Sequence, residues 1–120
     1  MSKEKLDAIP DVQIDPDGVF KYILIKVSSK SGESKTIVRG DALSDYHSDV
    51  FDKTAPGIKA LGLNCEALGG GRIDHSSTKK SILVYGYSMG YGQADHSVAC
   101  ELLKKHYPDY KSITFSNEGY

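Results

Sequence analysis

The feature of this sequence that most restricts its fold is the nine-residue run Val19–Val27 (VFKYILIKV). The run is rich in β-branched and aromatic residues, which favour a strand packed within a sheet. With 120 residues the chain is long enough for one core around a single sheet and too short for a second domain. We therefore predict one compact domain, residues 1–120, whose sheet contains this strand.

Shorter patterns predict the remaining elements. Pro56-Gly57 should kink or interrupt the first helix, because proline lacks an amide donor and clashes with the preceding turn. Residues 1–9 are expected to fray. In chain order we expect a strand at 35–39, a helix from Asp41 to Leu61, a strand at 65–68, a hairpin of 72–75 with 81–87, a helix at 93–106 and a strand at 113–115. Two main helices packed on a mixed sheet make the predicted fold α/β (α+β).

Charge and composition argue against several partners. The formal net charge is −1 and the charged fraction is 26%, which gives no basis for non-specific binding to nucleic acid or to an anionic membrane. No apolar run approaches the roughly 20 residues of a membrane span, and the N-terminal residues lack the apolar core of a secretory signal. Cys65 and Cys100 are expected to be free buried thiols in a cytoplasmic protein, since disulfides are rare in that compartment.

A glycine-rich turn, Ser88–Gly92 (SMGYG), joins a predicted strand to a predicted helix. Such a turn directs several backbone N–H groups outward at the positive end of the helix, and this arrangement binds anions. The Ser88 hydroxyl adds a further donor. The alternative is an ordinary tight turn in which one or two glycines adopt positive φ.

His47 lies on the predicted first helix, on the face shared with Leu43, Val50 and Phe51 that should meet the sheet. A histidine on such a face is more often a core residue with satisfied hydrogen bonds than a catalyst. Imidazole is nevertheless the side chain best suited to proton transfer or nucleophilic attack near neutral pH. The residues alone leave both interpretations of His47 open.

Three cationic residues fall on predicted sheet segments. Lys21 interrupts an apolar strand, Arg39 lies near a strand end, and Arg72 follows three glycines. Each of them either faces solvent or lies at the mouth of a pocket as the partner of a phosphate.

Three other motifs carry chemistry in unrelated proteins. Residues 86–90 match G-x-S-x-G, the nucleophile elbow of serine hydrolases, but the chain is short for that fold and the His and Asp residues after Ser88 all lie on or next to one helix. Six residues separate Cys65 from Arg72, one more than in the loop of cysteine phosphatases. The four histidines show no H-x-x-x-H or H-x-E spacing, so we expect no metal ion and no cofactor.

Seven segments, in order along the chain, resemble one known family. They are IPDVQIDPDGVFKY (9–22), IVRG (37–40), DYHSDVFDK (45–53), LGGGRIDH (68–75), VYGYSMGYGQADH (84–96), KHYPDY (105–110) and NEGY (117–120). Together they resemble the small phosphohistidine phosphatases of the Janus/ocnus family. The resemblance covers nearly the whole chain, and the combination of segments is far more specific than any one of them.

The resemblance implies hydrolysis of phosphohistidine in proteins without a metal ion, with phospholysine or small phosphoramidates as further substrates. It places the catalytic histidine on His47, the substrate lysine on Lys21 and the phosphate-contacting turn on Ser88, Met89 and Gly90. The motif positions expected near the pocket are Arg39, Tyr46, Arg72 and Tyr87. A family member has alanine in place of Gly90 and lacks the Pro56-Gly57 break, and neither departure touches His47 or Lys21. We expect the protein to be a monomer.

The sequence leaves two roles open for His47. It can accept a proton from the attacking water as a general base, which is the role we favour, or it can take the phosphoryl group itself. A different class of function is also open, because the same pocket could bind phosphate or recognise a phosphorylated partner protein without turnover. The remaining enzyme alternative is a serine hydrolase that uses Ser88.

Overall fold

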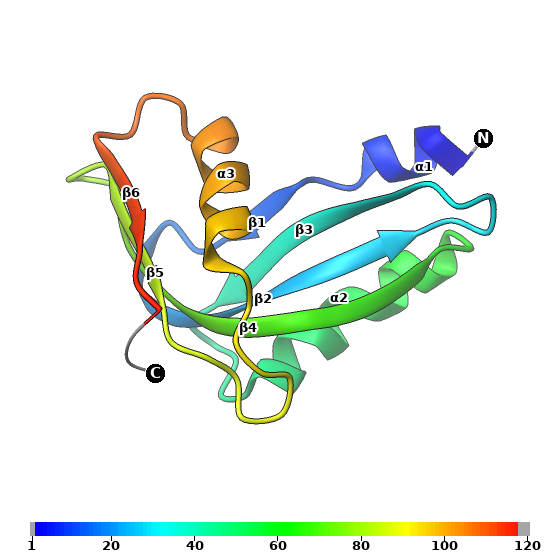
Figure 1. Ribbon diagram of the computed structural model, residues 1–120, viewed down its shortest axis with the longest axis horizontal. Helices are drawn as coiled ribbons and strands as arrows, with labels where there is room; N and C mark the ends of the chain where they lie inside the picture. The colour runs from blue at the N-terminus through cyan, green and yellow to red at the C-terminus, as the bar shows by residue number, and fades with distance from the viewer. Residues whose placement is uncertain (1, 118–120) are drawn as a thin grey trace.

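The structure is a computed structural model that describes residues 2–117, so residues 118–120 of the NEGY segment lie outside it. Six strands and three helices follow one another along the described chain (Figure 1). They are α1 (Ser2–Ala8), β1 (Val12–Ile14), β2 (Asp17–Ser28), β3 (Ser34–Asp41), α2 (His47–Ala60), β4 (Asn64–Ser76), β5 (Ser81–Tyr85), α3 (His96–His106) and β6 (Ser112–Phe115).

The strand predicted at Val19–Val27 is confirmed as the greater part of β2, which lies near the middle of the sheet. The strand order is β1-β3-β2-β4-β5-β6. Strands β3 and β4 flank β2, and both pair with it in antiparallel fashion. The outer strands β1 and β6 pair in parallel with β3 and β5. The sheet is therefore mixed, and the predicted α+β fold is confirmed.

Apolar side chains cover both faces of β2, and a different helix packs on each face. Ile23 and Ile25 belong to a core cluster with Val50 and Ile58 of α2. Tyr22 and Leu24 belong to a second cluster that includes residues of α3. Figure 1 shows α2 and α3 on opposite sides of the sheet. Successive strand residues point to opposite faces, so the position of a β2 residue predicts which helix it meets.

Helix α2 begins at His47, six residues later than predicted. Asp41 instead ends β3, where it pairs with Lys21 of β2, and Leu43 lies in the connection with 88% of its surface exposed. Of the two outcomes predicted at Pro56, the interruption is wrong, because α2 continues to Ala60. A proline within a helix removes one backbone hydrogen bond, and the burial of Val50 and Ile58 against the sheet outweighs that loss.

Strand β4 runs without a break through Gly69–Gly71, so the two strands predicted at 65–68 and 72–75 are one strand of 13 residues. The pairing of β4 with β2 shifts register between Leu24 and Ile25, next to this glycine run. A glycine inside a strand often marks a close approach of another part of the molecule. The site described below shows what approaches these glycines.

The chain ends and the borders of α3 also differ from the predictions. Residues 2–8 form α1 instead of fraying, because Leu6 and Ile9 are buried in the core beside α2. Strand β1 was not predicted, and β5 ends at Tyr85 instead of residue 87. Helix α3 begins at His96 instead of residue 93. Asp95 is its N-cap, and the Asp95 carboxylate accepts a hydrogen bond from the Ser97 amide. None of the described helices is long and apolar enough to cross a membrane.

Candidate active site

A cavity of about 340 Å³ lies between the first turn of α2, strands β2 and β4, and the turn that follows β5. Eight of the nine residues predicted for the site line it, and Ser48 completes the wall. The lining residues are Lys21, Tyr46, His47, Ser48, Arg72, Tyr87, Ser88, Met89 and Gly90. Segments that are far apart in the sequence therefore meet at one place, as the resemblance implied.

His47 is the first residue of α2, and its imidazole lies against β4. Its Nε2 is 2.9 Å from the carbonyl oxygen of Gly71. A carbonyl only accepts, so Nε2 carries the proton and Nδ1 carries the lone pair. No residue in 2–117 hydrogen-bonds Nδ1 of His47. Every side-chain nitrogen or oxygen in that range that is fully buried has a hydrogen-bond partner, so Nδ1 is not one of the fully buried atoms. Nδ1 is therefore accessible from the cavity that His47 lines.

The surroundings of His47 keep its imidazole neutral. Burial lowers its pKa below the ordinary value for histidine, and although the bond to the Gly71 carbonyl raises the pKa, the charges of Lys21 and Arg72 lower it again. The net direction is downward. A neutral ring with a lone pair on Nδ1 can accept a proton or attack an electrophile at neutral pH.

Gly70 makes room for this ring. A Cβ atom placed on Gly70 would lie 2.6 Å from Cδ2 of His47 and 2.8 Å from the carbonyl oxygen of Tyr22. Both distances are shorter than non-bonded carbon contacts allow. The glycine run inside β4 therefore has a steric cause, and its position between two predicted strands was the signal that sequence reasoning left unused.

His96 is a second buried histidine, which the sequence reasoning weighed only as a partner for Ser88. It lies on the opposite face of β4, where a Cβ on Gly71 would approach its Cε1 to 2.7 Å. Its Nε2–H donates to the carbonyl oxygen of Gly86 at 2.8 Å, and the Tyr22 hydroxyl donates to its Nδ1. Both ring nitrogens are thus occupied, and His96 fixes the strand end from which the turn of the site begins.

The turn after β5 forms one side of the cavity through Ser88, Met89 and Gly90. The Ser88 amide donates to the Gly92 carbonyl at 3.0 Å, and the Gly92 amide donates back to Ser88. Within the described chain no backbone acceptor is bound by the amides of Met89 and Gly90. The Ser88 hydroxyl accepts from the Tyr91 amide at 3.1 Å and keeps its own proton for donation.

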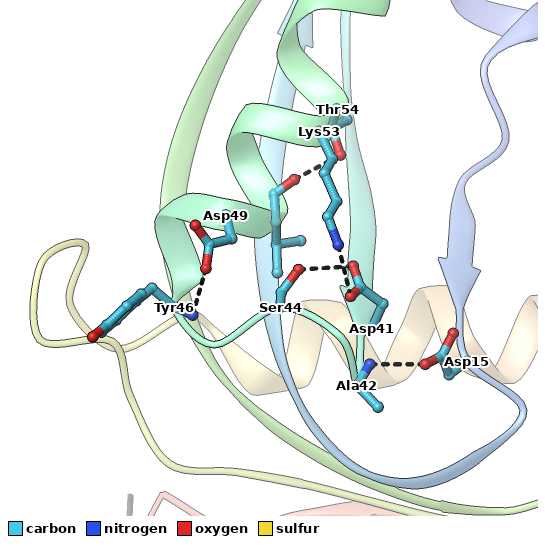
Figure 2. A network of polar contacts seen from close by, with 9 residues as sticks. Asp15, Asp41, Ala42, Ser44, Tyr46, Asp49, Lys53 and Thr54 are labelled. Atoms are coloured by element: carbon cyan, nitrogen blue, oxygen red, sulfur yellow. Dashed lines mark hydrogen bonds and ion pairs between the residues drawn. The ribbon is translucent and has the colours of Figure 1, made fainter.

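The helix whose positive end meets this cavity is α2, and not the helix that follows the turn. Tyr46 precedes α2, and its amide donates to Asp49 Oδ2 at 2.9 Å (Figure 2). His47 and Ser48 of the first turn line the cavity, whereas no residue of α3 does. The expectation that α3 would lie behind the site is therefore wrong, although a helix N-terminus is present at the cavity.

Lys21 and Arg72 form a cationic wall. The two residues are directly opposed on β2 and β4, so their side chains project from the same face of the sheet. That face is the one that α2 covers, since Ile23 two residues along β2 packs in the α2 cluster. An anion in the cavity meets two positive charges next to the neutral imidazole.

Arg39 does not belong to this site, and its predicted place near the pocket is wrong. Its side chain is 6% exposed and donates to the carbonyl oxygens of Val38 and Pro10. It lines a separate cavity of about 390 Å³ with residues of β3 and α2. Burial lowers the pKa of Arg39 to about 10, so the guanidinium remains charged at neutral pH.

The alternative chemistries are not assembled in the structure. In the described part of the chain, no histidine nitrogen is hydrogen-bonded to Ser88, so a Ser-His pair is absent. Cys65 and Arg72 lie toward opposite ends of β4, and burial raises the pKa of the Cys65 thiol. Residues 2–117 contain no group of three or more His, Cys, Asp or Glu side chains arranged to hold a metal ion.

The fold and the site define a small α+β protein in which one histidine and two cations share a cavity beside a glycine-rich turn. The chain belongs to the Janus/Ocnus family (Ocnus), whose family profile matches residues 6–111. It is 54% identical to the 14 kDa phosphohistidine phosphatase of Sus scrofa over 121 residues, which span 96% of this chain and 95% of that protein. The 14 kDa phosphohistidine phosphatase of Homo sapiens is 52% identical over the full length of both chains.

A further relative carries a different name. The sex-regulated protein janus-A of Drosophila melanogaster is 46% identical over 120 residues, which span all of this chain and 88% of the fly protein.

Proposed function

We propose that the protein is a phosphohistidine phosphatase that hydrolyses the P–N bond of phosphohistidine in proteins. The observation that carries the proposal is the neutral His47 imidazole, whose Nδ1 faces a cavity walled by Lys21 and Arg72. The names of the porcine and human relatives, at 54% and 52% identity, support the same activity. Phospholysine and small phosphoramidates share the P–N bond and are further substrates of the proposal.

The residues around the cavity hold the phosphoryl oxygens. Phosphoryl transfer passes through a loose transition state whose charge is spread over the three peripheral oxygens. Lys21 and Arg72 neutralise that charge, and the amides of Met89 and Gly90 with the Ser88 hydroxyl donate hydrogen bonds. Donors held in place before the substrate arrives need no reorganisation during the reaction.

His47 acts as the general base. Its Nδ1 takes a proton from a water molecule as the water oxygen bonds to phosphorus. The P–N bond breaks, and the leaving imidazole of the substrate takes up a proton from solvent and departs as neutral histidine, with inorganic phosphate as the second product. His47 then releases its proton to solvent and returns to its neutral form. The bond from Nε2–H to Gly71 holds the ring while its charge changes.

The proposal includes turnover without a metal ion, by a monomer in the cytoplasm. The two cations and the amides supply the charge neutralisation that a metal ion gives elsewhere, and protonation makes imidazole a good leaving group. The free thiols Cys65 and Cys100 are typical of a reducing compartment.

The test uses a histidine-phosphorylated protein as substrate with EDTA present, and measures phosphate release by the wild type, His47→Ala and His106→Ala. His106→Ala is the matched control, because His106 lies at the end of α3 and does not line the cavity. The wild type and the control should hydrolyse the substrate, and His47→Ala should not. Binding of the phosphoprotein without turnover by the wild type would identify a recognition module instead. Rapid-quench trapping of phosphate on His47 would replace the general base by a nucleophile.

A further inference from the structure

Asp41 is a carboxylate placed next to the cation that the proposed site uses. It ends β3, where it is directly opposed to Lys21 of β2. Opposed residues on antiparallel strands project from the same face, with Cβ atoms roughly 4.5–5.5 Å apart. A carboxylate in that position can reach the Lys21 ammonium. Such an ion pair would neutralise Lys21 and occupy the hydrogen bonds that a phosphoryl group needs.

The structure shows that Asp41 is engaged elsewhere. Lys53 of α2 donates from Nζ to its Oδ1 at 3.1 Å, and the Ser44 hydroxyl donates to Oδ2 at 3.0 Å. Figure 2 shows Lys53 reaching down from the helix and Ser44 approaching from the connection between β3 and α2. Both oxygens of the Asp41 carboxylate are thus hydrogen-bonded to groups other than Lys21. Asp41 and Lys53 line the cavity of Arg39, and neither lines the candidate active site.

The charges in this arrangement are present at neutral pH. Burial raises the pKa of Asp41, but the hydrogen bonds from Lys53 and Ser44 lower it by more, so the carboxylate is ionised. Lys21 forms no ion pair with any carboxylate in residues 2–117. Among residues 2–117 the cation that pairs with Asp41 is therefore Lys53, although Lys21 is its neighbour on the sheet.

We propose that Lys53, assisted by Ser44, is a positioning residue that holds the Asp41 carboxylate away from Lys21 and so keeps Lys21 available to the phosphoryl group. The inference rests on the proposed function, since it concerns the cation of that site. Lys53 acts through Asp41 and Lys21 and does not touch the substrate. Loss of Lys53 frees Asp41 to pair with Lys21.

The test compares K53M, D41N and the double variant D41N/K53M with the wild type, using a histidine-phosphorylated protein as substrate. K53M keeps the apolar stem of the lysine and removes its charge. We expect kcat/KM of K53M to fall about 3- to 10-fold, mainly through KM, because a charge-assisted contact to the substrate weakens. D41N and D41N/K53M should stay within about 2-fold of the wild type, since neither retains a carboxylate that can pair with Lys21.

K80M is the matched control. Lys80 also forms one ion pair with an aspartate, at 3.0 Å from Asp109, and lies far from the site in the connection between β4 and β5. K80M should leave kcat/KM unchanged. If K53M does not fold, S44A removes one of the two hydrogen bonds to Asp41, and the pair S44A and D41N/S44A carries the same comparison.

The titration of His47 by NMR gives a readout that does not depend on turnover. The charge of Lys21 helps to lower the pKa of His47, so pairing of Lys21 with Asp41 should move this pKa upward in K53M, and D41N/K53M should return it to the wild-type value. If the wild type is active and K53M has the same kcat/KM, the inference is overturned. Equal impairment of K53M and D41N/K53M also overturns it, because a structural role of Lys53 predicts that result. An inactive wild type refutes the proposed function, and the His47 titration then decides the inference separately.

Discussion

The Nε2–H of His47 donates to the carbonyl oxygen of Gly71, one residue beyond the glycine against which the His47 ring lies. The bond joins the first turn of α2 to the middle of β4, so it fixes the direction of the ring and its tautomer together. The same contact leaves Nδ1 as the atom that faces the cavity. The geometry of the site therefore depends on a stretch of β4 that carries no side chains.

Gly70→Ala tests this dependence. The new methyl group would lie 2.6 Å from His47 Cδ2 and 2.8 Å from the backbone oxygen of Tyr22, so either the ring or the strand must move. We expect kcat/KM to fall about 100-fold, the scale of a misplacement of about 1 Å, and the free energy of unfolding to fall by about 1–3 kcal/mol. Phosphate release and urea denaturation measure the two effects. Activity like that of the wild type would show that the ring needs no such space.

Gly57→Ala is the counterpart in α2 and should stabilise the protein. Gly57 lies inside the helix, with no heavy atom within 4 Å of a Cβ placed there. Glycine in a helix interior is destabilising relative to alanine by roughly 0.5–1 kcal/mol, because it loses more conformational freedom on folding. Urea denaturation should show a gain of about that size with unchanged activity. A loss of stability would mean that the methyl group meets an obstruction.

The pH dependence of the reaction follows from the neutral form of His47. Its pKa is lowered from the ordinary value of 6.5, first by burial. The general base is active when unprotonated, so kcat/KM should be highest above neutral pH and should reach half of its plateau value below pH 6.5. The measurement is kcat/KM against pH, corrected for the uncatalysed loss of phosphate. A midpoint above pH 6.5 would contradict a lowered pKa.

Tyr22→Phe tests the structural role of His96 apart from the chemistry of His47. The Tyr22 hydroxyl donates to His96 Nδ1 in the buried α3 side of the sheet. Without it the nitrogen loses its partner, which costs about 1–3 kcal/mol in the free energy of unfolding. Tyr110→Phe is the control, because Tyr110 is only half-buried and its hydroxyl, which meets Nε2 of His75 at 2.6 Å, can be replaced by water, so its loss should cost less. Equal losses in urea denaturation would show that the full burial of Tyr22 adds nothing to the cost.

The sequence predicted those parts of the fold and site that depend on local patterns. The β-branched run of β2, the hairpin of β4 and β5, and β6 have such patterns, and the structure contains them. The family-like segments brought together eight of the nine residues predicted for the site. These segments lie beside one another only in the folded chain, so their spacing in the sequence does not predict a shared site. The resemblance to the family gave that prediction.

The failures arise from contacts between distant segments. The start of α2 was placed at Asp41 because no local pattern shows that β3 extends to pair with Lys21. Arg39 was placed near the site because a cation at a strand end gives no sign of the backbone carbonyls that hold it. The glycine run was assigned to a strand end because the two histidine rings that need the space come from other elements.

Lys21→Met tests the cationic wall through two independent effects. The first is binding, since loss of a charge-assisted hydrogen bond to the phosphoryl group costs about 1–3 kcal/mol, which corresponds to roughly a 5- to 150-fold fall in kcat/KM. The second is electrostatic, because the charge of Lys21 helps to lower the pKa of His47. Without that charge the pKa rises, and the fall of kcat/KM at low pH should begin at a higher pH than in the wild type.

Lys26→Met is the matched control for Lys21→Met, because Lys26 lies on the same strand, is exposed, and does not line the cavity. It should change neither kcat/KM nor the pH profile. A lowered kcat/KM in Lys21→Met with an unshifted profile would mean that Lys21 holds the substrate without acting on His47. The opposite result is a shifted pH profile with kcat/KM at neutral pH unchanged. That result would contradict the contact between Lys21 and the phosphoryl group, because the reaction at neutral pH would then proceed equally well without the Lys21 ammonium.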